Sequence, residues 1–117
     1  MEEERRIREM LLSKAVDYLP EACQLNDNMA RNPEIGSQEY NSSSAIVELL
    51  RKYGIETEYP FAGFATAFKG IINPKKEKRM AVLAEYDALR GMGHACGHCA
   101  SGSASVMAAL AFHSVED

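Results

Sequence analysis

The sequence predicts an α/β domain in which helices pack on a small, mainly antiparallel sheet of about three strands. Three long stretches carry apolar residues at spacings of three and four, which is the period of one helical face. Three strand-length segments, separated by turns rich in Pro, Gly and Asn, lie between the second and third of these stretches. With 117 residues, the chain fits a single domain, residues 1–117, which can bury a core without disulfides.

The first helical stretch runs from Glu2 to about residue 31. Its apolar stripe consists of Ile7, Leu11, Ala15, Tyr18 and Leu19. Pro20 lacks the N–H group that a continuing helix would use, so we expect a kink or a restart there. The apolar pattern then resumes and ends at Asn32-Pro33, which is a typical stop signal.

A connector over residues 33–40 leads into the second helical stretch. Its apolar stripe consists of Ala45, Ile46, Leu49, Leu50 and Tyr53. Gly54 is suited to end this helix in the left-handed conformation. The three serines at positions 42–44 are predicted to form its exposed face or its cap.

The three predicted strands cover residues 55–59, 64–72 and 79–86. Short turns link them, which favours antiparallel pairing of consecutive strands. The third strand contains a continuous apolar run, Met80 to Ala84, which is typical of a strand covered on both faces. An alanine-rich helix is predicted from Ala100 to about residue 113.

Composition and charge narrow the class of protein. The apolar fraction of 46% and the charged fraction of 26% are ordinary for a globular protein. A net charge of −4 argues against nucleic acid as a partner, because phosphate binding needs a basic surface. The first residues lack a signal-peptide pattern, and no apolar run approaches the roughly 18 residues that span a bilayer. We therefore expect a cytoplasmic protein with no membrane partner.

Reactive side chains are concentrated in the loop after the third predicted strand. The candidates are Asp87, His94, Cys96, His98 and Cys99. Cys96 and His98 could face one metal ion if the chain turns sharply at Gly97. A catalytic zinc site needs three protein ligands, so further donors would have to join them. Asp87, at the carboxyl end of the strand, could ligate the metal or orient a ligating histidine.

Two other interpretations of this loop remain open. Cys96 and Cys99 form a Cys-x-x-Cys motif before a helix, and a helix N-terminus lowers a thiol pKa as disulfide oxidoreductases require. The chain has no Trp, however, and the tryptophan that usually precedes such a motif is therefore missing. In the third interpretation, the histidines and cysteines only pack or form hydrogen bonds in a glycine-rich turn.

Two motifs carry a resemblance to a known family. Ala84 to Leu89 (Ala-Glu-Tyr-Asp-Ala-Leu), followed by Gly93 to His98 (Gly-His-Ala-Cys-Gly-His), resembles the signature of the dinuclear-metal amidohydrolases. That family includes aminoacylases, auxin-conjugate hydrolases and p-aminobenzoyl-glutamate hydrolases. The segments 32–40 and 50–54 also resemble its N-terminal helices, so the similarity covers nearly the whole chain.

The resemblance implies specific roles. Cys96 and His98 would be metal ligands, Asp87 the catalytic supporting carboxylate, and His94 a supporting residue. The cofactor would be zinc or manganese, with two ions in the complete site. The implied reaction is hydrolysis of a small amide substrate, an N-acyl amino acid or an aminobenzoyl-glutamate-like compound, by metal-activated water. The fold would be the N-terminal part of an amidohydrolase-type catalytic domain, with the α/β/α layers of zinc peptidases.

The sequence differs from this family at two positions, and it matches only part of the length of the family's chains. Arg90 stands where members usually have Pro, and Cys99 where they usually have Asp or Asn. The family's glutamate base and remaining ligands come later in its chains than the region matched here. We therefore expect little or no hydrolase activity from this chain alone. We also expect an unpaired sheet edge, and hence a homo-oligomer; a non-enzymatic metal-binding oligomer is the remaining alternative.

Overall fold

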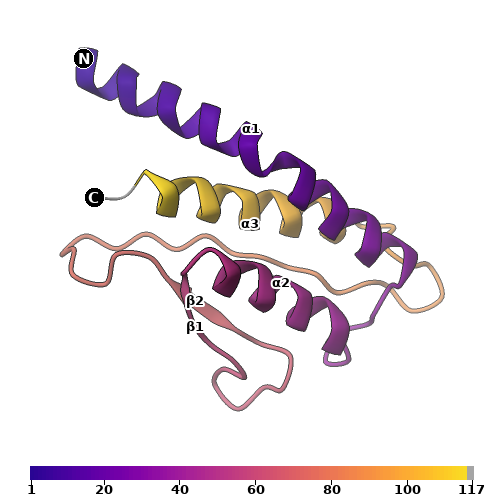
Figure 1. Ribbon diagram of the computed structural model, residues 1–117. Coiled ribbons are helices and arrows are strands. Elements are labelled where there is room, and N and C mark those ends of the chain that lie inside the picture. Colours follow the sequence, from indigo (N-terminus) through magenta and orange to yellow (C-terminus); the bar gives the residue numbers. More distant parts are fainter. Residues whose placement is uncertain (116–117) are drawn as a thin grey trace.

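The computed structural model describes residues 1–115. In this part, the elements are α1 (Glu2–Arg31), α2 (Tyr40–Lys52), β1 (Glu56–Glu58), β2 (Lys69–Ile71) and α3 (His98–Ser114) (Figure 1). The chain is thus a mixture of helices with a small two-stranded antiparallel sheet, as the coarse α/β prediction requires. Among the described residues, no helix combines the length and the apolar character needed to cross a bilayer.

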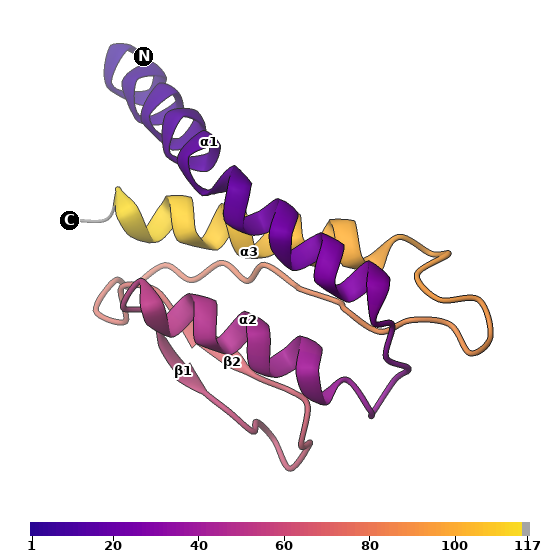
Figure 2. The same cartoon turned by 45° about the vertical axis from the view of Figure 1, so that its right-hand side comes forward.

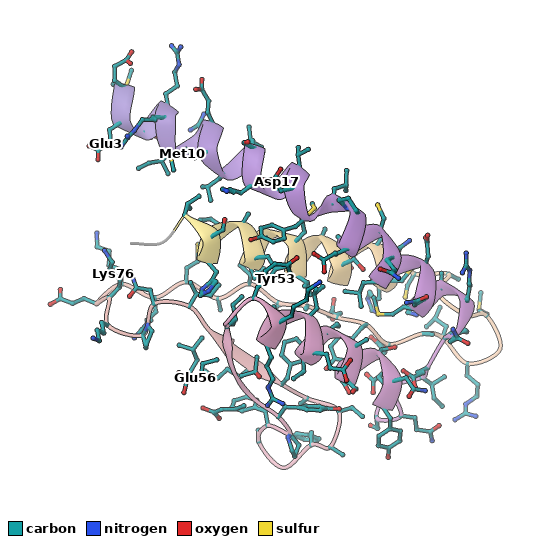
Figure 3. All side chains as sticks on the ribbon, in the orientation of Figure 1. Glu3, Met10, Asp17, Tyr53, Glu56 and Lys76 are labelled. Atoms are coloured by element: carbon teal, nitrogen blue, oxygen red, sulfur yellow. The ribbon has the colours of Figure 1, made fainter. Side chains whose placement is uncertain are left out.

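Helix α1 is continuous for 30 residues and includes Pro20 in its interior, so the helix does not restart there. Its axis changes direction near the middle (Figure 2). The C-terminal half packs along α3, and Ala22, Leu25 and Met29 are its buried residues. The N-terminal half diverges from α3, and Figure 3 shows Glu3 and Met10 on this projecting part.

The hydrophobic core lies between the three helices and the chain that follows α2. Ile46 and Leu110 are 0% and 1% exposed, and they pack with the other members Leu25, Met29, Leu50, Ile55, Tyr86, Cys99 and Val106. Two serines predicted to be exposed or capping, Ser42 and Ser43, are buried. The Ser43 hydroxyl lies 2.8 Å from the Tyr59 hydroxyl, and this hydrogen bond allows a polar side chain inside the core.

The sheet is smaller than the sequence predicts. Strands β1 and β2 lie within the predicted segments 55–59 and 64–72, with Thr57 opposite Gly70. Gly54 ends α2 in the left-handed region with φ +83, as predicted.

The third predicted strand, residues 79–86, is extended but forms no strand. Among residues 1–115, its peptide groups make no backbone–backbone hydrogen bond. The expected burial on both faces is also wrong, because Met80, Val82 and Leu83 are 78%, 50% and 82% exposed. In both views the segment runs between α3 on one side and α2 with the small sheet on the other (Figures 1 and 2).

Contacts with α3 fix the course of the extended segment. The Ser105 hydroxyl donates to the Leu83 carbonyl at 2.7 Å. Gly102 packs so closely that a Cβ atom there would lie 2.3 Å from the Glu85 carbonyl oxygen. The small residues at the start of α3 therefore allow the helix to lie directly against the backbone that leads to Asp87.

Candidate functional site

Asp87 and His98 form the centre of the candidate site. The Asp87 carboxylate Oδ1 lies 2.8 Å from His98 Nδ1, and the Asp87 carbonyl oxygen lies 3.1 Å from the same nitrogen. Because both oxygens only accept hydrogen bonds, Nδ1 carries the proton and donates it. The other ring nitrogen, Nε2, lies 3.6 Å from Glu85 Oε2. When the imidazole is neutral, Nε2 therefore has a lone pair that can bind a metal.

Electrostatics at His98 favour its charged form. Partial removal from solvent acts to lower the pKa of His98. The hydrogen bonds to Asp87 and the negative charges of Asp87 and Glu85 outweigh this effect and raise the pKa above its ordinary value. The His98 imidazole therefore lies between the carboxylates of Asp87 and Glu85, and about a quarter of its side chain (26%) is exposed.

Local backbone geometry places these two side chains together. Gly97 has φ +81 immediately before the first residue of α3, a conformation that glycine adopts without a Cβ clash. On the other side, the Ala88 N–H donates to the Glu34 carbonyl at 2.7 Å, and Ile35 and Ala88 form an isolated parallel bridge. The connector after α1 thus holds the chain immediately after Asp87.

Glu85 is a member of the site that the sequence analysis did not single out. Its side chain is 66% exposed. Side chains two positions apart in an extended chain point to the same side, so Glu85 and Asp87 can both reach His98, the first residue of α3. That spacing was the available signal in the sequence.

His94 lies near the pair but is not hydrogen-bonded to it. Both of its ring nitrogens are buried, and neither has a hydrogen-bond partner among the described residues. Burial, followed by the proximity of His98, lowers the pKa of His94, although Asp87 acts in the opposite direction. These effects favour the neutral form of His94, and its predicted supporting role stays a prediction.

The two cysteines of the loop differ in their surroundings. Cys96 is exposed, whereas Cys99 is buried in the core, and both are free thiols. A buried, apolar environment keeps a cysteine unreactive, so the geometry does not favour thiol–disulfide exchange through Cys99.

The described residues do not form a complete metal site. Within residues 1–115, no group of three His, Cys, Asp or Glu side chains is placed to hold an ion. The structure brings together Asp87, His98 and Glu85, and does not bring Cys96 into a three-donor cluster with them. The assignment of Cys96 and His98 as metal ligands, and of Asp87 as a catalytic residue, stays a prediction.

The curated proteins to which this chain is similar in sequence are named as peptidases. The chain is 37% identical over 90 residues to thermostable carboxypeptidase 2 and 36% identical over 90 residues to thermostable carboxypeptidase 1 of Saccharolobus solfataricus. It is 30% identical over 118 aligned positions to the Xaa-Arg dipeptidase of Mus musculus. The aligned regions cover 64%, 64% and 87% of this chain.

These relatives are much longer than the region compared. The aligned regions cover 23%, 23% and 27% of their lengths, so the chain spans about a quarter of the curated relatives it matches. No protein-family profile matches the chain. The similarities support a peptidase, and hence hydrolase, lineage for this protein.

Proposed function

We propose that this chain carries the first part of a metal-dependent amidohydrolase or peptidase centre, in which Cys96 and His98 bind a divalent metal. The observation that supports this most directly is the bond of 2.8 Å between Asp87 and His98 Nδ1. Ligating histidines usually donate their other N–H to a carboxylate in this way. The peptidase names of the similar proteins agree with this proposal.

Each residue would contribute in a definite way. Asp87 fixes the His98 ring and its tautomer, so that Nε2 is the ligating atom. Cys96, exposed on the loop, supplies a thiolate, which suits zinc better than a harder ion. The bound zinc or manganese would activate water and polarise the scissile carbonyl of the amide. A cytoplasmic location would keep the Cys96 thiol reduced.

The complete site would need donors in addition to Cys96 and His98. In its complete form, the fold would have the α/β/α layers of zinc peptidases and hold two metal ions. The substrate would be a small N-acyl amino acid, aminobenzoyl-glutamate-like compound or peptide. Because the described residues gather no three donors, the 117-residue chain alone should show little or no hydrolysis of such amides. Metal-dependent turnover by the purified chain would contradict this part of the proposal.

Metal binding tests the proposal without relying on activity. The purified chain is titrated with Co²⁺, which reports a thiolate ligand by a charge-transfer band, and with Zn²⁺ in competition. We expect one ion per chain, loss of the thiolate band in Cys96→Ser, and loss of binding in His98→Gln. Asp87→Asn should weaken binding by about 10–100-fold, because the ring loses its orienting carboxylate.

Cys23→Ser is the matched control, because Cys23 is also an exposed free thiol but lies on α1. It should bind metal as the parent chain does. Binding that is unchanged in both Cys96→Ser and His98→Gln would refute the proposed ligands. A non-enzymatic metal-binding oligomer would bind metal in the same way. The hydrolase and the non-enzymatic oligomer can be told apart only when the remaining metal ligands are supplied and amide hydrolysis is measured.

A further inference from the structure

The extended segment 79–86 makes no backbone–backbone hydrogen bond within the part of the chain that the structure describes. One side packs on α3 through Gly102 and Ser105. Its peptide N–H groups have no backbone partner among residues 1–115, and Leu83 is 82% exposed. An exposed, apolar, extended segment whose peptide N–H groups have no backbone partner is a template for pairing with a strand.

Charges at the two ends of the segment make it complementary to itself. Lys78 and Arg79 precede the apolar run, whereas Glu85 and Asp87 follow it. In an antiparallel pair of identical strands, the basic end of one copy lies beside the acidic end of the other. Opposite charges directly across such a pair stabilise it.

We propose that two copies of this chain pair antiparallel through residues 79–85, about a twofold axis at Val82. In this register, Arg79 of each copy lies opposite Glu85 of the second copy, and Ala81 lies opposite Leu83. Residues that are directly opposed in an antiparallel pair point to the same side of the sheet. The register therefore keeps the odd-numbered side chains on the solvent side of both copies and leaves Tyr86 in the core.

Glu85 and Arg79 are both available for this contact. Glu85 is 66% exposed, and its Oε2 lies 3.6 Å from His98 Nε2. Arg79 donates to the carbonyls of Asn73 and Pro74, but a guanidinium has five N–H donors and can bind a carboxylate as well. The adjacent register, in which Arg79 faces Asp87, would compete with the bond from Asp87 to His98.

The nearest strand of the same chain does not occupy this edge. Val82 and Ala84 line an apolar cavity of about 80 Å³ together with Phe68, Gly70 and Ile72. No backbone hydrogen bond joins these two stretches in the part of the chain that the structure describes. Strand β2 pairs with β1 and with no other strand in the described part.

The first test reverses charges. Sedimentation of the purified chain over a range of concentrations should show a monomer–dimer equilibrium. Arg79→Glu and Glu85→Arg should each weaken the dimer on the order of tenfold, because two symmetric pairs become repulsive. The double variant, Arg79→Glu with Glu85→Arg, should restore it. Lys75→Glu, an equal charge change in the preceding turn, is the control and should leave the dimer intact.

The second test locates the axis. In the proposed register, the two Val82 positions are about 4.5–5.5 Å apart between Cα atoms, within reach of a disulfide. Oxidised Val82→Cys should therefore form an interchain disulfide, identified by peptide mapping. Met80→Cys is the matched control, because its two copies would lie roughly 13 Å apart along the ladder.

Hydrogen exchange distinguishes pairing with a second copy from pairing with another strand of the same chain. Protection of the amides of residues 79–85 should increase with protein concentration if a second copy covers them. Protection that does not depend on concentration would mean that β2 of the same chain pairs with the segment, and would overturn the proposal. A strictly monomeric chain would also overturn the proposal; this result is expected if only other protein segments cover the edge. A dimer whose affinity does not change with the charge reversals would overturn it as well.

Discussion

Replacing Gly102 by Ala tests how α3 and the extended segment hold the candidate site together. The new Cβ would lie 2.3 Å from the Glu85 carbonyl oxygen, whereas real Cβ contacts are essentially never below 3.0 Å. The obstacle is a backbone atom, which cannot rotate away. The helix and the segment must therefore move apart by at least 0.7 Å, the difference between these two distances.

The magnitude follows from two opposing effects. Overpacking of this kind costs about 1–3 kcal/mol, while Ala is better than Gly in a helix by about 1 kcal/mol. Because the strain falls on main chain in a buried position, we expect the cost to be near its upper end. The net loss in the free energy of unfolding should be about 1–2 kcal/mol.

Urea unfolding followed by tyrosine fluorescence measures this loss, since the chain has five Tyr and no Trp. Gly36→Ala is the matched control. Nothing lies within 4 Å of the Cβ position at Gly36, and its φ is not in the left-handed region. This variant should be unchanged or more stable by about 0.4–1 kcal/mol.

A second measurement separates a general loss of stability from displacement of the site. His98 and Gly102 are four residues apart and lie on the same face of α3, so the shift should also separate His98 from Asp87. The pKa of His98, followed by NMR, should fall toward its ordinary value in Gly102→Ala and stay raised in Gly36→Ala. A Gly102→Ala chain as stable as the parent, with an unchanged His98 pKa, would refute this account of the packing.

Two further predictions concern the framework of the site. The Glu34 carboxylate accepts N–H bonds from Asn41 at 3.0 Å and from Ser42 at 2.6 Å; burial alone would raise the pKa of Glu34, but bonds from these two residues lower it. Because the pKa is lowered in the folded state, the stabilisation is present above the unfolded value of 4.5 and is lost as the pH falls through the folded value. Glu34→Gln should therefore lower the free energy of unfolding by about 1–2 kcal/mol at pH 7. In urea unfolding, the difference in stability between this variant and the parent should become smaller below pH 4.5. A difference in stability that does not vary with pH would contradict the role of the Glu34 charge. Ile46→Ala, at a position that is 0% exposed, should cost about 2–5 kcal/mol, whereas Leu12→Ala, at a position that is 63% exposed, should stay within about 0.5 kcal/mol of the parent in the same measurement.

Local patterns were enough to predict the helices. Apolar spacing located α2 and the buried half of α1, and Gly54 marked the turn after α2. The patterns were not enough for the strand at 79–86, because its apolar run indicates burial but not what provides it. Sheet formation depends on a partner strand, and the described chain does not supply one to this segment.

For the site, the residue types and the Asp87–His98 association could be foreseen, but the surroundings could not. Ser43 and Cys99 read as polar or reactive in the sequence, yet both are buried in the fold. Glu85 enters the site because an extended chain repeats every two residues. Whether Cys96 and His98 bind the same metal ion depends on further metal ligands from other parts of the fold, which a short sequence motif does not specify.

The projecting half of α1 also affects how unfolding of this protein should be read. No residue of this fully described helix before Ala22 is buried, and exposed ion pairs such as Arg5 with Glu9 add little. Helical turns without tertiary contacts are marginal in water. Far-ultraviolet circular dichroism should therefore begin to decline before tyrosine fluorescence does, and a single-transition fit to the dichroism would understate the cooperativity of the core.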